Sequence, residues 1–322
     1  MARIKRTAGL GDGEARRLRV SGRRLGQGVY AVGHDRTDVE RLATRARAAL
    51  LVAPPGSVVC GATALALAKV RLPRRVEAMA AGPVHLAVPP GAGSRPRRPG
   101  IVCVRPKVMP PSAPARPEGI QVAFLPHCWM QVTAALMHGP GWDFTRRHLV
   151  PTSPGVFTEP RKAAFLEAVQ IGDQLVMRKN PLVGFDDFAQ YVGSATNMRG
   201  VRAARSVFGL VRARTDSTME SWLRLAVWDA GFPDPVVNHP VTVAGKSRFL
   251  DLAWPELGID LEFHGRQHFY EYEQAYGDLA RRNQLQLGGW VLVEATESDL
   301  MSPGGLLQRL GAVFAAQRAK RP

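Results

Sequence analysis

The clearest pattern of apolar and polar positions lies between residues 249 and 264, where two alternating segments flank the connection Pro-Glu-Leu-Gly at 255–258. Alternation with a period of two predicts β-strands that bury one face. If the connection forms a hairpin loop, Trp254 pairs with Ile259. The same register places Asp251 directly opposite Glu262, and opposed residues of an antiparallel pair share one face. The sequence therefore predicts a hairpin that holds two carboxylates together.

Two neighbouring carboxylates repel each other unless positive charge lies between them. In proteins this charge is most often a divalent metal, and hard carboxylate oxygens suit Mg²⁺ or Mn²⁺. His264 follows Glu262 by two residues and faces the same side of the predicted strand. Two metal-binding carboxylates beside a base are what metal-dependent phosphodiester hydrolysis requires. The alternative is a half-exposed hairpin whose polar face is only solvated.

The C-terminal stretch, from about residue 215 to residue 310, resembles the DUF559 family, whose domain is a Vsr-like PD-(D/E)xK endonuclease fold. The matching positions are 217–221, 230–233, Asn238, 251–256, 262–268, Asp278, Arg281 and 289–292. The resemblance implies an α/β (α+β) core, in which a mixed sheet carries flanking helices, with Mg²⁺ or Mn²⁺ as the cofactor. His264 stands where the family usually has Asp.

The candidate site residues differ in how many roles they allow. Asp251 and Glu262 are expected to bind the metal, because a lone Asp in the apolar run Leu-Asp-Leu-Ala-Trp is costly unless it is used. His264 is a general base, a metal or phosphate contact, or a solvated strand residue. His268 is regular in the resembling family, which implies a role in the site. Asp260 lies nearer the turn and is expected to be solvated.

Two further positions have competing interpretations. Glu220 ends the S-x-x-E pattern of a helix capping box before an apolar run, whereas the family resemblance implies that it completes the metal site. The predicted helix over 269–286 carries Arg281 and Arg282. Either Arg281 pairs on the surface with Asp278, three residues before it, or Arg281 or Arg282 contacts DNA phosphate.

Charge is spread unevenly along the chain. The net charge is +16, and residues 1–118 carry 22 Lys and Arg against 7 Asp and Glu, which gives +15 for the first third. A basic block of this kind indicates a polyanionic partner, above all duplex DNA. A GC-rich genome is a rival cause of frequent arginine, but it does not explain the scarcity of acidic residues.

Part of the N-terminal charge lies in a short predicted basic helix, residues 13–25, that leads into a Gly-Val-Tyr strand. This arrangement is similar to the end of the winged helix-turn-helix in AbiEi-type antitoxin-like proteins. The resemblance implies a DNA-binding region within 1–118. Phosphate contacts are expected from Arg16, Arg17, Arg19, Arg23 and Arg24.

The chain is long enough for two or three domains. We expect a basic winged-helix-like region at 1–118, a mainly helical connecting domain at 119–214 and the nuclease-fold domain at 215–322. Residues 89–118 are rich in Pro, Gly and Arg, which predicts loops around a strand at 101–104. No apolar run reaches the roughly 18 residues of a membrane span, and no phosphate-cradling loop for an NTP is present. With three isolated cysteines, the chain is expected to be cytoplasmic.

Two functions from different classes fit these features. The first is a metal-dependent DNA endonuclease, with its metal on Asp251 and Glu262 and a basic N-terminal region that grips DNA. The second is an antitoxin-like DNA-binding regulator, whose degenerate nuclease-fold domain serves for folding or for homodimer contacts. A weaker third hypothesis is a nick- or mismatch-specific repair enzyme, by analogy with Vsr.

Overall fold

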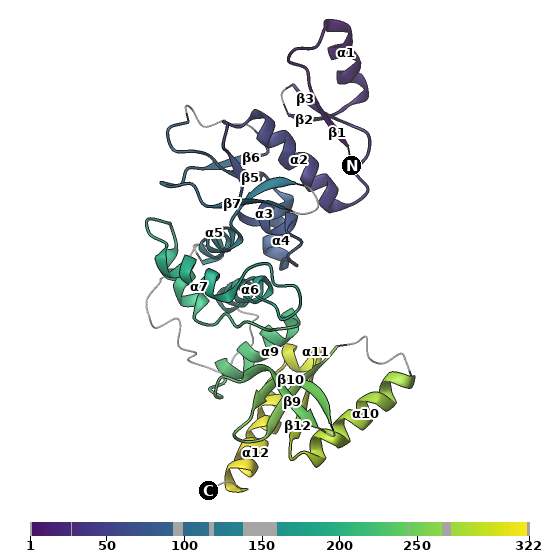
Figure 1. Cartoon of the computed structure of the whole chain (residues 1–322), viewed down its shortest axis with the longest axis vertical. Helices are drawn as coiled ribbons and strands as arrows, with labels where there is room; N and C mark the ends of the chain where they lie inside the picture. Colours follow the sequence, from purple (N-terminus) through teal and green to yellow (C-terminus); the bar gives the residue numbers. More distant parts are fainter. Residues whose placement is uncertain are drawn as a thin grey trace. The chain divides into compact units, whose positions relative to one another are not determined.

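The computed structural model describes residues 2–26, 28–92, 99–115, 119–137, 160–243, 245–265 and 272–320. The chain forms two compact units (Figure 1). The first comprises Met1–His138 and Asp186–Arg205, and the second comprises Gly139–Phe185 and Ser206–Pro322. The predicted connecting segment 119–214 therefore contributes residues to both units. Helices occur together with parallel and antiparallel strands, which confirms the predicted mixed α/β (α+β) class.

A small antiparallel sheet with one helix begins the first unit. Its strands β1 (Arg3–Arg6), β2 (Arg23–Gly26) and β3 (Val29–Val32) lie in the order β1-β3-β2, and α1 (Asp12–Ser21) connects β1 to β2. The predicted helix over 13–25 is wrong at its C-terminal end, because Gly22 is extended and the next residues pair with β3. A Cβ atom at Gly22 would lie 2.7 Å from the carbonyl oxygen of Leu18, so this exit from the helix requires glycine.

The larger sheet of the first unit has the strand order β6-β5-β4-β8-β7. The strands are β4 (Val58–Val59), β5 (Val84–Ala87), β6 (Ile101–Val104), β7 (Ser112–Ala115) and β8 (Ile120–Ala123). The accompanying helices are α2 (Asp38–Val52), α3 (Gly61–Leu67), α4 (Arg74–Ala81), α5 (Leu125–Met137), α7 (Phe185–Ser194) and α8 (Val201–Phe208). Trp129 of α5 contacts Phe188 of α7 edge to face, with ring centroids 5.0 Å apart.

The expectation for residues 89–118 is confirmed in part. The predicted strand at 101–104 is β6, but residues 112–115 form a second strand, β7, where only loop was expected. Pro114 lies within β7. Proline is tolerated there because β7 is the edge strand of the sheet, so that the missing N–H interrupts no further ladder.

A four-stranded mixed sheet forms the centre of the second unit. Its strands are β9 (Val236–Val243), β10 (Lys246–Trp254), β11 (Ile259–His264) and β12 (Val291–Thr296), in the order β12-β11-β10-β9. Strand β11 is antiparallel to β10 and parallel to β12. Trp254 pairs with Ile259, as the hairpin register predicts.

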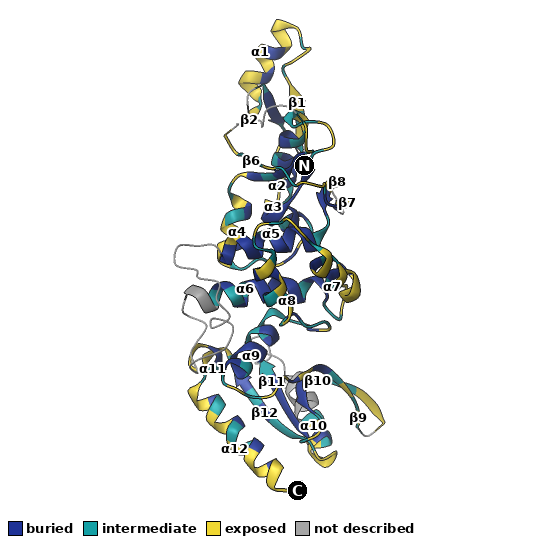
Figure 2. Ribbon diagram, turned by 90° about the vertical axis from the view of Figure 1, so that its left-hand side faces the viewer, coloured by how far each residue is buried: buried dark blue, intermediate teal, exposed yellow. Residues whose placement is uncertain are grey.

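Helices cover both faces of this sheet. On one face, α9 (Thr218–Asp229), α11 (Glu297–Met301) and α12 (Gly304–Lys320) bury an apolar core that includes Trp254, Leu261 and Phe314. On the other face, Leu285 of α10 (Tyr272–Leu287) packs in a smaller cluster with Ala253. Strand β11 is therefore largely buried between helices, whereas parts of β9 and the start of β10 are exposed (Figure 2). The predicted mixed sheet with flanking helices is confirmed.

The helix α6 (Pro160–Leu175) belongs to the same unit and packs against α9. The two helices share a fully buried ion pair, in which Arg224 Nη2 lies 2.9 Å from Asp173 Oδ2. Among the described residues, no helix is long and apolar enough to cross a membrane.

Candidate functional site

The regular alternation of side chains along β10 is broken at Asp251. Leu250 packs in the cluster beneath α10, whereas Leu252 packs in the core beneath α9. These residues are two positions apart and would share a face in a regular strand. Opposite the break, Asn238 of β9 has a positive φ of 47°. Asp251 Oδ2 accepts a hydrogen bond of 3.1 Å from the backbone N–H of Phe263, so its carboxylate lies close to the adjacent strand β11.

Asp260 and Glu262 lie on the face of β11 that α10 covers. The pairing of Ala253 with Asp260 places this carboxylate beside the Ala253–Leu285 cluster. Asp260 is 0% exposed and Glu262 is 5% exposed. Both carboxylate oxygens of Asp260 are buried and accept no hydrogen bond from the residues described. The expectation that Asp260 is solvated is therefore wrong, because a helix covers the face that alternation alone left open to water.

Arginines of α10 supply positive charge to this face. Arg281 Nη2 pairs with Glu262 Oε1 and also donates to the carbonyl oxygen of Phe249 at 3.1 Å. Arg282 pairs with Glu294 of β12, and Nε2 of His264 lies 3.3 Å from the same Glu294 oxygen. The pairing of Arg281 with Glu262 was not predicted from the sequence, and contact of Arg281 or Arg282 with DNA stays a prediction. The side chain of Asp278 lies outside the described residues.

Glu220 combines a capping role with a place near Asp251. The hydroxyl of Ser217 accepts from the backbone N–H of Glu220 at 3.1 Å, which is one half of the predicted capping box. Glu220 Oε2 accepts instead from the N–H of Asp216 at 2.9 Å and from Asn238 Nδ2 at 3.1 Å. Burial, and then the negative charge of Asp251, raise the pKa of Glu220 to about 7.

The pKa values of Asp251 and Asp260 are raised for similar reasons. Burial, followed by repulsion from Glu262, raises the pKa of Asp251 to about 6, while the N–H of Phe263, Arg281 and His264 act in the opposite direction. Burial and then Glu262 also raise the pKa of Asp260 well above its usual value. One guanidinium therefore does not balance the charge of this group, so its carboxylates either bind a proton or are stabilised by another cation.

The donor chemistry of the site fits a hard divalent cation. Asp251 and Glu262 lie on adjacent strands, and Mg²⁺ is commonly held by one or two carboxylates together with waters. The orphaned oxygens of Asp260 are additional hard donors beside them. Within the described part of the chain, however, no three His, Cys, Asp or Glu side chains are grouped as metal ligands. The residues thus fit a two-carboxylate site rather than a cage of three protein ligands.

Comparison with known proteins gives a partial likeness. No protein-family model matches the chain. It is 30% identical over 121 residues to two proteins of Mycobacterium tuberculosis, the uncharacterized protein MT2308 of strain CDC 1551 / Oshkosh and the uncharacterized protein Rv2248 of strain ATCC 25618 / H37Rv. The aligned stretch is 37% of this chain and 45% of each relative. The chain thus spans less than half the length of the relatives it matches.

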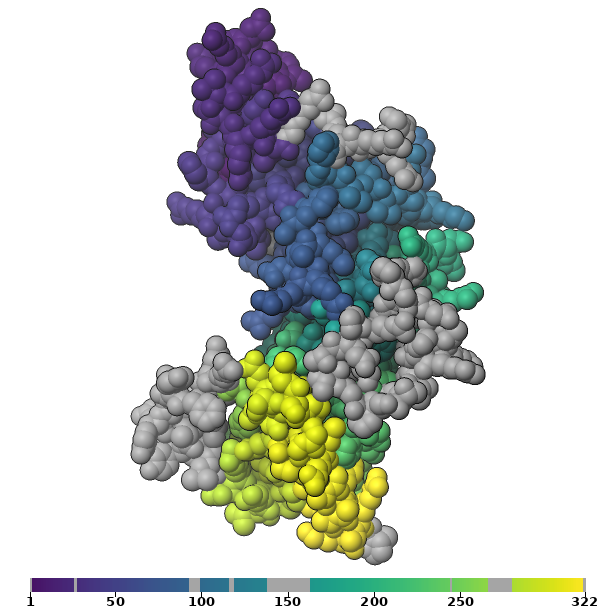
Figure 3. Space-filling view, turned by 180° about the vertical axis from the view of Figure 1, so that it is seen from behind, coloured from purple at the N-terminus to yellow at the C-terminus, as the bar shows by residue number. Residues whose placement is uncertain are grey.

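The remaining predicted residues lie elsewhere. Arg16, Arg17 and Arg19 are exposed on α1, the N-terminal segment coloured purple in Figure 3. Arg24 is exposed on β2, whereas Arg23 pairs at 2.6 Å with the carboxylate of Asp35. His268 lies outside the described residues. The roles of all these residues in DNA contact or catalysis stay predictions.

Two groups near the site were not predicted from the sequence. Asn238, noted only as a match to the family pattern, bonds Glu220. Arg178 pairs with Asp216 through two hydrogen bonds, and its guanidinium lies 4.2 Å from the ring centre of Phe249. Arg178 and Asp216 are 38 positions apart, so no local pattern of residues indicates this contact.

The raised pKa of Asp251 predicts a pH-dependent stability. The folded-state value of about 6 lies above the ordinary 3.8, so the unfolded chain releases this proton first. The stabilisation is complete below about pH 4 and is lost as the pH rises to about 6. Asp251→Asn should therefore gain about 3 kcal/mol relative to the parent chain over this interval. Urea unfolding in metal-free buffer at a series of pH values measures the difference, and a constant difference would contradict the prediction.

Proposed function

We propose that the chain is a metal-dependent endodeoxyribonuclease. The observation that carries this proposal is a group of three carboxylates in the second unit: half-buried Asp251 and buried Asp260, which have raised pKa values, and buried Glu262, which pairs with Arg281. Burying such a group is costly unless a bound cation stabilises its ionised form. A stable fold does not need carboxylates grouped in this way. Metal-dependent phosphodiester hydrolysis needs them to hold the metal ion.

In this proposal Asp251 and Glu262 would hold Mg²⁺ or Mn²⁺, and Glu220 on α9 would add negative charge near Asp251. The bound ion would stabilise negative charge on the phosphate. His264 is the candidate base. Its Nε2 lies 3.3 Å from a carboxylate oxygen of Glu294, which would stabilise the imidazolium formed when the ring takes a proton from water. Arg281 holds Glu262 in place until the ion binds.

A plasmid assay tests the proposal. Purified full-length chain is incubated with supercoiled plasmid in EDTA, Mg²⁺ or Mn²⁺, and nicked and linear products are resolved on a gel. We expect cleavage with a divalent ion and none in EDTA. Intact plasmid with every ion, together with tight duplex binding, would reject the nuclease.

A DNA-binding regulator is the second candidate function. It is favoured by the pairing of Arg281 with Glu262, because a permanent guanidinium neutralises a carboxylate that a nuclease leaves for the metal. A regulator would bind duplex DNA equally well with and without Mg²⁺. In either case we propose a cytoplasmic protein, and a homodimer stays a prediction.

Both candidates require the N-terminal arginines to contact DNA. Replacing Arg16 and Arg17 together by Ala should weaken duplex binding about tenfold and reduce the salt slope, d log K/d log[salt], by roughly two. Arg36 and Arg74 are exposed arginines of the same unit, and their double Ala variant removes the same charge. Fluorescence anisotropy between about 50 and 300 mM salt (about a sixfold range) compares duplex binding by the two double variants. Equal losses in the two variants would show that only net charge matters.

A further inference from the structure

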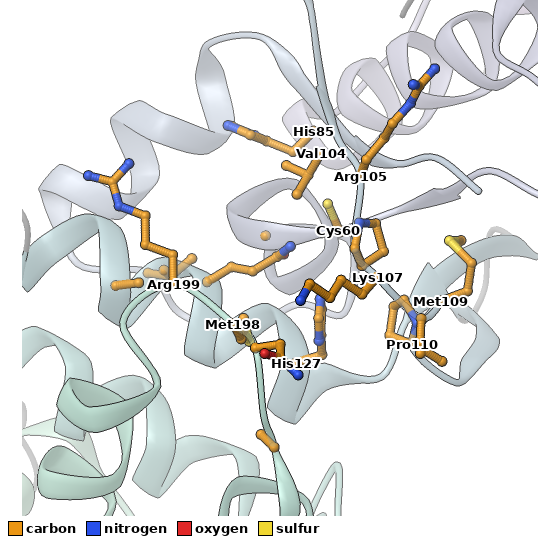
Figure 4. Close-up of a pocket in the computed structure, with 18 of the residues that line it drawn as sticks. Cys60, His85, Val104, Arg105, Lys107, Met109, Pro110, His127, Met198 and Arg199 are labelled. Carbon is orange, nitrogen blue, oxygen red and sulfur yellow. The ribbon is translucent and has the colours of Figure 1, made fainter. Parts of the chain in front are cut away.

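A cavity of about 990 Å³ lies within the first unit. This volume is at the upper end of the range for small-molecule sites, about 300–1,000 Å³. Its lining comes from the start of α3, from α5, from the segment after β6 and from the loop that follows α7 (Figure 4). The cavity shares no residue with the carboxylate site.

The loop that follows α7 is fixed by Arg205. The Arg205 guanidinium donates to the carbonyl oxygens of Val192, Gly193 and Ala195, at 3.2, 2.8 and 2.8 Å. These are the last carbonyls of the helix and the first of the loop. The cavity wall contributed by residues 194–199 is therefore held in one place, as a preformed binding site requires.

His127 contributes a ring nitrogen without a hydrogen-bond partner among the described residues to the cavity wall. The residue is 7% exposed, and its Nδ1 lies 2.9 Å from the hydroxyl of Tyr191. Its Nε2 is buried without a hydrogen-bond partner among the described residues. Burial lowers the pKa of His127 to about 4, so the ring is neutral at ordinary pH. A buried ring nitrogen of this kind is unfavourable until a ligand or a water satisfies it.

The charge of the lining has one sign. Arg105, Lys107 and Arg199 line the cavity, and none of the described lining residues is Asp or Glu. Lys107 is exposed, and no ion pair is found for it among the residues described. The other walls are largely apolar and include Met109, Pro110 and Met198 (Figure 4). A positive rim over apolar walls favours an anion with an apolar body.

We propose that this cavity binds a small organic anion, with its carboxylate or phosphate at Lys107, its apolar or aromatic body against the methionines and prolines, and a polar group bonded to His127. Two classes of ligand have this chemistry, aromatic carboxylates and mononucleotides. The site is independent of the carboxylates in the second unit. Asp251→Asn should therefore leave binding unchanged.

Titration calorimetry of the full chain tests the proposal with two pairs of probes. Adenosine monophosphate is compared with adenosine, and indole-3-acetate with indole. We expect at least one anion to bind about tenfold more tightly than its neutral counterpart. Lys107→Gln should weaken that binding about tenfold, as expected for loss of a charge-assisted hydrogen bond. The pair of probes that shows this difference tells whether the cavity prefers a phosphate or a carboxylate.

Two further variants separate the cavity from general surface charge. Ala135 lines the cavity and is exposed, so Ala135→Trp fills the space without disturbing a buried position and should abolish binding. Lys5 is exposed on β1 and does not line the cavity, so Lys5→Gln should have no effect. Binding of neither anion at millimolar concentration, or equal weakening by Lys5→Gln and Lys107→Gln, would overturn the proposal.

Discussion

Replacement of Asp251 by Asn, or of Glu262 by Gln, is expected to reduce divalent-ion-dependent plasmid cleavage by about 100- to 1000-fold, the usual effect of removing a group that stabilises developing charge. The amides keep the shape of each side chain but remove its negative charge and one hard oxygen donor. Initial nicking rates at saturating Mg²⁺ measure the change.

The stability of these variants distinguishes a chemical effect from unfolding. Asp251 has a raised pKa because burial and Glu262 disfavour its charge, so Asp251→Asn should be at least as stable as the parent chain near pH 7. Glu256 is an exposed carboxylate in the turn of the same hairpin, and Glu256→Gln is the matched control that should cleave normally. Calorimetric binding of Mn²⁺ gives a second readout, which should weaken only in the site variants.

An active Asp251→Asn variant that still binds Mn²⁺ would contradict this assignment. The same result in Glu262→Gln would show that the metal does not bind at the hairpin. If the parent chain is inactive and binds no Mn²⁺, the pairing of Arg281 with Glu262 becomes the resting arrangement of a regulator.

The hairpin of the second unit could be predicted because its information is local. Six alternating residues and a short turn fix the pairing of Trp254 with Ile259. Registers of this kind depend on neighbouring residues alone. The ladder between β10 and β11 ends at the pairing of Leu252 with Leu261, so the predicted pairing of Asp251 directly opposite Glu262 is not part of it, although the two charges are near enough to repel each other. The predicted helix over 269–286 corresponds to α10 within the described residues.

The environment of the hairpin could not be predicted in the same way. Period-two alternation shows that Asp260 and Glu262 share a face, but not whether water or a helix covers it. Here α10 covers it, so Asp260 is buried and Arg281 reaches Glu262. The facing change at Asp251 lies opposite Asn238 of another strand, whose φ is positive, and no local pattern of β10 reveals it.

Loss of Arg224 is expected to produce the largest change in stability. Arg224 is fully buried on α9, and its Nη2 lies 2.9 Å from Asp173 on α6. Asp173 also accepts a hydrogen bond from the N–H of Arg212 at 2.8 Å. Arg224→Leu leaves the buried carboxylate without its counter-charge, which should cost about 3–5 kcal/mol of unfolding free energy in urea.

The double variant Asp173→Asn with Arg224→Leu tests that cause. The Asn oxygen can still accept from Arg212 and carries no charge, so the double variant should recover most of the loss. Arg309→Leu breaks an ion pair with Asp299 in which the arginine is 53% exposed, and it should cost less than about 1 kcal/mol. A double variant as unstable as Arg224→Leu would show that packing, not charge, is responsible. Because α9 also carries Glu220, the same pair determines how firmly the carboxylate of Glu220 is held beside Asp251.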